Sequence, residues 1–148
     1  MLQSIANMRV LAELCKSHEP LPEPLASWLA ESLKSFLDQK SPSLNEAFGV
    51  RNARGGIPWR TEEGIRIRDS ALRELAARHL TGLSLSARAE TVHRLSCRYG
   101  ASSWRFDKDR ELMPPAYCGG PQEFLWRAFK SGATMPLCTR QLRTILAG

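Results

Sequence analysis

Residues 61–80, TEEGIRIRDSALRELAARHL, decide the fold together with residues 86–100, SARAETVHRLSCRYG. In the first stretch, apolar side chains recur at spacings of seven, three, one and four, which place them on one face of an α-helix. They are Ile65, Leu72, Leu75, Ala76 and Leu80. In the second stretch, the apolar residues Ala89, Val92, Leu95 and Tyr99 follow at spacings of three, three and four. The two stretches therefore predict two amphipathic helices.

The connection between them, TGLSLS at residues 81–86, contains residues that can end the first helix and cap the second. Gly82 can adopt the left-handed conformation that follows a helix end. Ser86 can accept a hydrogen bond from the first amides of the next helix, and Gly100 is expected to end that helix. Two helices joined by a glycine-containing turn have the outline of a helix-turn-helix unit.

The remaining apolar runs also fit a helical period. They predict helices at residues 4–16, 25–37 and 44–48, one or two turns after residue 102, and further helices at 121–131 and near 137–146. Ser43 and Glu46 form a capping box before the third of these. We therefore predict an all-α protein, a single compact domain at residues 1–148 with about six helices.

The charge is unevenly distributed along the chain. Residues 1–48 hold four Lys and Arg against six Asp and Glu, whereas residues 49–148 hold seventeen against nine. Arginine outnumbers lysine sixteen to five, which suits contacts to phosphate or to carboxylate. The acidic part at 1–48 and the arginine-rich part at 49–148 thus favour a nucleic-acid partner or an acidic protein partner. No apolar run has the length of a membrane span, and no secretory signal is evident, so we expect a cytoplasmic protein without membrane association.

Arginines that lack a local acid are the candidates for binding. Four arginines follow an acid by four residues, which favours a pair on the helix surface: Arg66, Arg73, Arg78 and Arg94. Those expected to meet a partner are Arg51, Arg54, Arg60, Arg68, Arg88 and Arg98. Trp126 lies off the apolar stripe of its helix beside Arg127 and Lys130, so it can stack on a base or anchor a protein. The alternative for Trp126 is that the last helix covers it.

No pattern in the chain specifies a reaction, a cofactor or a metal. His93 and Cys97 have the spacing of helical metal ligands, but the four cysteines lack any C-x-x-C pair. We therefore expect reduced cysteines, a buried Cys97 and no metal. The Gly55–Gly56 loop lacks the Lys and Ser or Thr of a phosphate-binding loop. No G-x-S-x-G elbow occurs either, so we expect no enzymatic activity.

The segments SLNEAFGVR, GG and RDSALRELA, between residues 43 and 77, resemble uncharacterised helical proteins of proteobacterial phages and other mobile elements. The resemblance implies a small phage-type regulator or a host-interacting protein, and it implies no activity. Our first hypothesis is a nucleic-acid-binding regulatory protein that uses its arginine-rich face. The second is a non-enzymatic interaction module that docks on an acidic protein.

Overall fold

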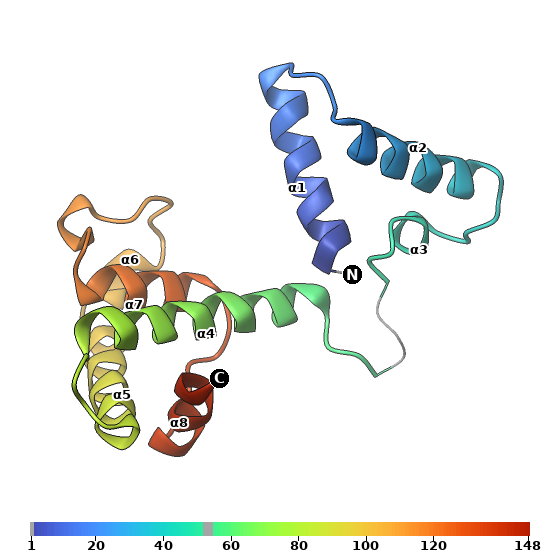
Figure 1. Cartoon of the computed structure of the whole chain (residues 1–148). Coiled ribbons are helices and arrows are strands. Elements are labelled where there is room, and N and C mark those ends of the chain that lie inside the picture. The colour runs from blue at the N-terminus through green and yellow to red at the C-terminus, as the bar shows by residue number, and fades with distance from the viewer. Residues whose placement is uncertain (1, 52–54) are drawn as a thin grey trace. The chain divides into compact units, whose positions relative to one another are not determined.

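A computed structural model describes residues 2–51 and 55–148, and these residues form helices and connecting loops without any strand (Figure 1). The all-α prediction is confirmed. Contacts divide the chain into two compact units, an N-terminal unit at residues 1–59 and a C-terminal unit at residues 60–148. The predicted charge boundary after residue 48 falls near the end of the N-terminal unit. One compact domain that includes both units stays a prediction.

The N-terminal unit contains α1 (Leu2–Ser17), α2 (Glu23–Leu37) and α3 (Leu44–Ala47). Proline in the first turn of α2 starts that helix as expected, because a proline there gives up no helical hydrogen bond. The Ser43 hydroxyl accepts a hydrogen bond from the Glu46 amide at 3.3 Å, so the predicted cap of α3 is present.

The core of the N-terminal unit is small. Ile5 and Leu25 are its buried apolar residues among those described, and the Trp28 ring lies 5.4 Å from the Phe48 ring. The apolar stripe predicted on α2 exists, but its second half is exposed to solvent. This unit therefore buries much less apolar surface than its sequence offers.

The C-terminal unit is built from α4 (Trp59–His79), α5 (Leu85–Ala101), α6 (Trp104–Asp107), the 3₁₀ turn η1 (Pro115–Tyr117), α7 (Pro121–Lys130) and α8 (Thr139–Ala147). The first residue of α4 belongs to the N-terminal unit. We expected about six helices, and the described residues form eight α-helices. The difference comes from α3 and α6, which are single turns of four residues.

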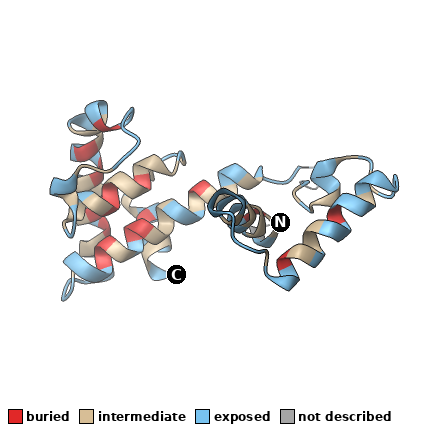
Figure 2. Ribbon diagram, turned by 90° about the horizontal axis from the view of Figure 1, so that it is seen from above, coloured by how far each residue is buried: buried red, intermediate tan, exposed pale blue. Residues whose placement is uncertain are grey.

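Helices α4, α5, α7 and α8 enclose the core of the C-terminal unit (Figure 2). Its buried residues are Ala71, Leu72, Leu75, Ala89, Val92, Tyr99, Phe124, Leu125, Ala128 and Leu142. Most of these are positions that the helical period assigned to the inner face. Each large buried side chain contributes roughly 1.5–3 kcal/mol relative to an exposed one, so this cluster holds the four helices together.

Two helix boundaries differ from the prediction. Ser84, not Ser86, caps α5, and its hydroxyl accepts from the Ala87 amide at 3.3 Å. Gly82 does adopt a positive φ of 84° in the preceding turn. Gly100 does not end α5, which continues to Ala101. A Cβ at Gly100 would lie 3.3 Å from the Phe129 ring, so the small residue allows close packing of α5 against α7.

A buried carboxylate ties the segment after α5 back to that helix. Asp107 Oδ2 accepts hydrogen bonds of 2.8 Å from the hydroxyls of both Tyr99 and Tyr117. Arg110 Nε lies 3.5 Å from Asp107 Oδ1. Burial, together with the bond to this carboxylate, raises the pKa of Tyr99 well above its usual range. Asp107 therefore has a structural role, and α6, a single turn, is too short to read a DNA groove as a recognition helix.

Candidate functional site

The positive charge of the chain resides in the C-terminal unit. Residues 60–148 hold fifteen Lys and Arg against nine Asp and Glu, a net charge of +6. Residues 1–59 hold six of each, so the N-terminal unit has no net charge. Any attraction to phosphate or carboxylate therefore acts through the C-terminal unit.

The acidic residues of α4 form ion pairs that the local spacing did not predict. Asp69 pairs with the neighbouring Arg68, with 2.6 Å between Nη2 and Oδ1, and not with Arg73. Glu74 accepts two hydrogen bonds of 3.0 and 3.1 Å from Arg127 of α7, and not from Arg78. Tertiary packing brings the Arg127 guanidinium in front of Glu74, where a two-pronged bond is stronger than a flexible surface pair. The prediction that Arg68 lacks an acidic partner is wrong, and Arg127, predicted as a binding residue beside Trp126, pairs with Glu74.

The displaced arginines make other contacts. Arg73 Nη1 donates to the carbonyl of Ile145 near the end of α8 at 3.4 Å, and the Arg78 guanidinium lies 5.5 Å from the centre of the Phe124 ring. Arg66 and Arg94 are exposed, and no ion pair joins either to an acid within the described residues. The expected split into paired and unpaired arginines is thus largely reversed on α4.

The other predicted binding arginines differ in their surroundings. Arg51 pairs with Glu46, so the expectation that it lacks an acid is wrong, and Arg54 lies outside the described residues. The spacing rule missed the Arg51 pair because Glu46 is five residues away, across the end of α3. Arg88 Nε donates to the Leu80 carbonyl at 3.2 Å and so closes the turn between α4 and α5. Arg98 is exposed at the rim of a small hollow between α5 and α7.

Trp126 and Lys130 lie together on α7. The Lys130 ammonium is 5.7 Å from the centre of the Trp126 ring and donates to the Lys108 carbonyl at 2.8 Å. Trp126 is half-buried and packs against the core, while its indole N–H has no hydrogen-bond partner among the described residues. Most of this tryptophan therefore contributes to packing within the C-terminal unit.

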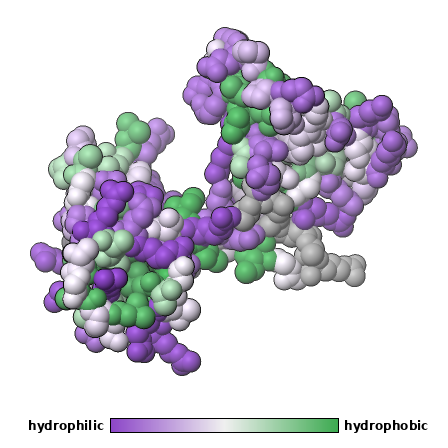
Figure 3. Space-filling view, in the orientation of Figure 1, coloured by the Kyte–Doolittle hydropathy of each residue, from purple (hydrophilic) through white to green (hydrophobic). Residues whose placement is uncertain are grey.

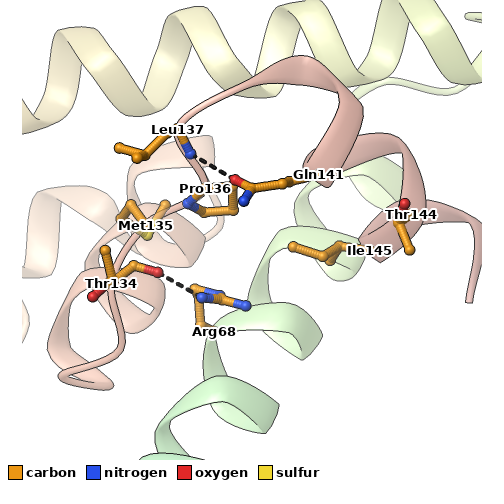
Figure 4. A pocket seen from close by; sticks show the side chains of 8 residues that line it. All are labelled: Arg68, Thr134, Met135, Pro136, Leu137, Gln141, Thr144 and Ile145. Atoms are coloured by element: carbon orange, nitrogen blue, oxygen red, sulfur yellow. Dashed lines mark hydrogen bonds between the residues drawn. The ribbon is translucent and has the colours of Figure 1, made fainter.

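A groove runs between α4 and the segment that joins α7 to α8, and Arg68 lies at its middle. On one side of Arg68 is a hollow of about 440 Å³, which Figure 4 shows from close by. Its lining residues are Arg68, Thr134, Met135, Pro136, Leu137, Gln141, Thr144 and Ile145. On the other side is a hollow of about 360 Å³, lined by Arg60, Thr61, Ile65, Arg68, Ser131, Gly132, Ala133 and Thr134. We call the two hollows together the Arg68 groove.

Arg68 holds the two walls of the groove together. Its Nη1 donates to the Thr134 carbonyl at 2.5 Å (Figure 4). Its Nε and Nη2 face Asp69. These bonds occupy three of the five N–H donors of a guanidinium, and two remain for a ligand. The described residues that line the groove include two arginines and no carboxylate. The two remaining N–H donors of Arg68 can bind an anionic group beside an apolar wall, although Asp69 already balances the charge of this guanidinium.

The sequence missed this groove, although one signal was present. Gly64 is buried in the second turn of α4, and a Cβ there would lie 2.7 Å from the carbonyl oxygen of Ser131. A glycine inside a helix costs stability unless something needs the space. Gly64 lets the α7–α8 connection approach α4 closely and so forms one wall of the groove.

The described residues contain no group of three or more side chains that could bind a metal ion. His93 Nε2 lies 3.3 Å from the Leu137 carbonyl and 3.8 Å from Cys97 Sγ, but no third ligand completes a group there or elsewhere in that part of the chain. No disulfide joins the four cysteines in the structure, and their reduced state stays a prediction. Cys97 is exposed and not buried, because it lies on the side of α5 away from the core.

None of the helices in the described part of the chain is long and apolar enough to cross a membrane. Comparisons with known protein families, with curated proteins and with solved structures find no match for this chain.

Proposed function

We propose that the protein binds nucleic acid through the arginine-rich C-terminal unit, with the Arg68 groove as the defined part of the contact surface. The observation that carries this proposal is the charge distribution: the whole net charge of +6 lies in residues 60–148. Within that unit, Arg60 and Arg68 line the groove, and Arg68, which also pairs with Asp69, keeps two N–H donors for a ligand. Arginine binds phosphate oxygens in a two-pronged geometry, which suits a nucleic-acid backbone.

The contacts are to phosphate more than to bases. The single turn of α6 offers no recognition helix. Phosphate contacts fix the register of the protein but carry little sequence information. Binding should therefore be strongly dependent on salt and weakly dependent on sequence.

The test introduces one carboxylate into the groove without disturbing the core. Thr61 is exposed in the groove wall near the start of α4, where an acidic residue is favourable for the helix. Thr61→Glu should weaken binding to fluorescently labelled single-stranded DNA, duplex DNA and RNA alike. It should also reduce the slope of log affinity against log salt by about 0.9 for one lost duplex phosphate contact.

The matched control is Thr81→Glu, which adds the same charge at an exposed turn outside the groove. Equal losses of affinity in both variants would indicate that binding depends on overall charge and not on a defined site. An absence of binding to all three nucleic acids at low salt would remove the proposal.

The second candidate is a non-enzymatic interaction module that docks on an acidic protein, and one observation favours it. The larger hollow of the groove has an apolar wall of Met135, Pro136, Leu137 and Ile145, and the Leu137 side chain is 81% exposed. Exposed apolar surface beside a cation suits a protein segment better than a phosphate backbone. This candidate would be supported if the protein bound no nucleic acid but did bind an acidic protein, and if Thr61→Glu weakened that binding. A phage or mobile-element role remains a proposal that rests on the sequence resemblance.

A further inference from the structure

The larger hollow of the Arg68 groove combines a compact volume with an apolar wall. Its volume of about 440 Å³ lies near the lower end of the range of small-molecule pockets, roughly 300–1,000 Å³. Met135, Pro136 and Ile145 provide most of the wall, and Leu137, whose side chain is 81% exposed, lines the hollow as well. Figure 3 shows hydrophobic surface in the part of the C-terminal unit that contains α8. An apolar ligand that covered this wall would remove apolar surface from water, which is favourable.

Arg68 closes one end of this hollow and keeps hydrogen-bond donors for a ligand. Its bond to the Thr134 carbonyl separates the larger hollow from the smaller one, because these two residues line both. After its bonds to Thr134 and Asp69, the guanidinium retains two of its five N–H groups. The Arg68 side chain is 13% exposed, so these contacts hold it in one orientation. A donor that is already fixed loses less entropy when it binds a ligand than a mobile surface arginine does.

Gln141 supplies further donors from the opposite wall. Its side-chain oxygen accepts a hydrogen bond of 2.9 Å from the Leu137 amide, which fixes the orientation of the side-chain amide group. The two N–H groups of Gln141 are therefore left without a partner in the described part of the chain. Figure 4 shows Arg68 on α4 and Gln141 on α8 at opposite sides of the hollow. Two helices that are distant in the sequence thus present N–H donors at one apolar hollow.

We propose that the larger hollow binds a small monocarboxylate with an apolar body. The carboxylate accepts hydrogen bonds from Arg68 and Gln141, and the body packs on the apolar wall. None of the described residues that line this hollow carries a carboxylate that would repel the ligand. Asp69 balances the charge of Arg68, so one negative charge fits this pair better than the double charge of a phosphate monoester.

This site goes beyond the proposed contact with nucleic acid and does not rest on it. A phosphodiester backbone brings a charged group to Arg68 but no apolar body to the wall beside it. A monocarboxylate with a short apolar chain satisfies both features of the hollow at once, because its charged end and its apolar end lie next to each other. The compact volume suits such a small molecule better than an extended chain.

Isothermal titration calorimetry of the full chain with octanoate, in the absence of nucleic acid, tests the proposal. We expect one bound molecule per chain, with a Kd of about 0.05–1 mM for a ligand of this size. Butyrate, which lacks four CH₂ groups, should bind at least about tenfold more weakly, because each fully buried CH₂ contributes roughly a factor of four. Octanamide, which has the same chain without the charge, should bind at least about fivefold more weakly, because hydrogen bonds to a charged acceptor are stronger.

Gln141→Glu tests the location, since it keeps the shape of the side chain and an oxygen for the Leu137 amide. It replaces two N–H donors by a second oxygen and adds a negative charge, so octanoate should bind at least about tenfold more weakly. Gln122→Glu, the same exchange at an exposed position in the first turn of α7, is the matched control and should leave the Kd unchanged. Leu137→Asp, which adds a carboxylate at an exposed side chain of the wall, should also weaken binding. Circular dichroism checks that each variant keeps its helices.

Three results would overturn the proposal. The first is an absence of octanoate binding to the unchanged chain up to about 5 mM. The second is an equal affinity of the Gln141→Glu and Gln122→Glu variants, which would place octanoate on other apolar surface of the chain. The third is an equal affinity for octanoate and octanamide, which would show that the hollow does not recognise the carboxylate. Because nucleic acid is absent from these measurements, their result is independent of the proposed function.

Discussion

Replacing Asp107 by Ala should destabilise the C-terminal unit more than any other exchange of a single acid. The Asp107 side chain is 4% exposed, and its Oδ2 is the acceptor for both tyrosine hydroxyls at 2.8 Å. The alanine variant leaves the Tyr99 hydroxyl buried without this acceptor. It also releases the loop that carries Tyr117.

The magnitude follows from the surroundings of each bond. A hydrogen bond to a charged group contributes about 1.5–3 kcal/mol when its donor is buried, as the Tyr99 hydroxyl is. The bond from Tyr117 contributes less, since that residue is half-buried and water can replace the carboxylate. Arg110 is 57% exposed, so its ion pair adds little. The sum is about 3 kcal/mol, which for a unit of this size lowers the melting temperature by roughly 12–24 °C.

Urea and thermal unfolding, followed by circular dichroism, measure this loss. Asp107→Asn should cost only about 1 kcal/mol, because one amide oxygen can accept both hydroxyls as neutral bonds. Asp109→Ala, an exposed neighbour, is the control and should change stability by less than about 0.5 kcal/mol. If the Asp107→Ala and Asp109→Ala variants unfolded alike, the buried network would not hold this segment.

Two further predictions concern the walls of the groove and the link between α4 and α7. Gly64→Ala should destabilise the C-terminal unit by about 1–3 kcal/mol, although Ala is the better helix former. The reason is that the new Cβ would lie 2.7 Å from the Ser131 carbonyl oxygen. A higher melting temperature of this variant would refute the prediction. The bond from Arg127 lowers the pKa of Glu74, so this stabilisation is present at neutral pH and is lost as the pH falls below the ordinary pKa of a glutamate and through the lower folded-state pKa. Glu74→Gln should therefore cost about 0.5–1 kcal/mol at neutral pH, discounted for partial exposure, and progressively less in acid. A cost that did not change with pH would contradict the role of the charge.

Much of the fold was predictable from local patterns. The apolar period identified the helices, and the cap at Ser43 and the left-handed Gly82 followed from residue type and position. These features depend on contacts between residues at most a few positions apart, which a sequence displays directly. The errors at Ser86 and Gly100 arose where two serines, two positions apart, could each cap the same helix and where a glycine served packing instead of termination.

The sequence determined how many charged residues the chain carries, but not which partner each of them contacts. The arginine excess after residue 48 was countable, whereas the partner of each arginine depended on which elements meet in space. Glu74 has Arg78 four residues away, yet it pairs with Arg127, 53 residues along the chain, because α7 packs beside α4. Local spacing predicts only pairs that share a helix, and a better-placed guanidinium from another helix displaces them.

The Arg68 groove and the buried Asp107 were decided by the tertiary structure alone. Asp107 lies in a stretch of alternating charges that gave no sign of burial, and two tyrosines from different elements make its burial possible. The groove exists because Gly64 admits the α7–α8 connection and Arg68 fastens its Thr134 carbonyl to α4. The sequence determined which stretches are helical, since that is a matter of neighbours along the chain. Which side chains are buried, paired or exposed in a hollow depended on residues that are distant in the sequence but close in space. Only the packing of the helices brings these residues together.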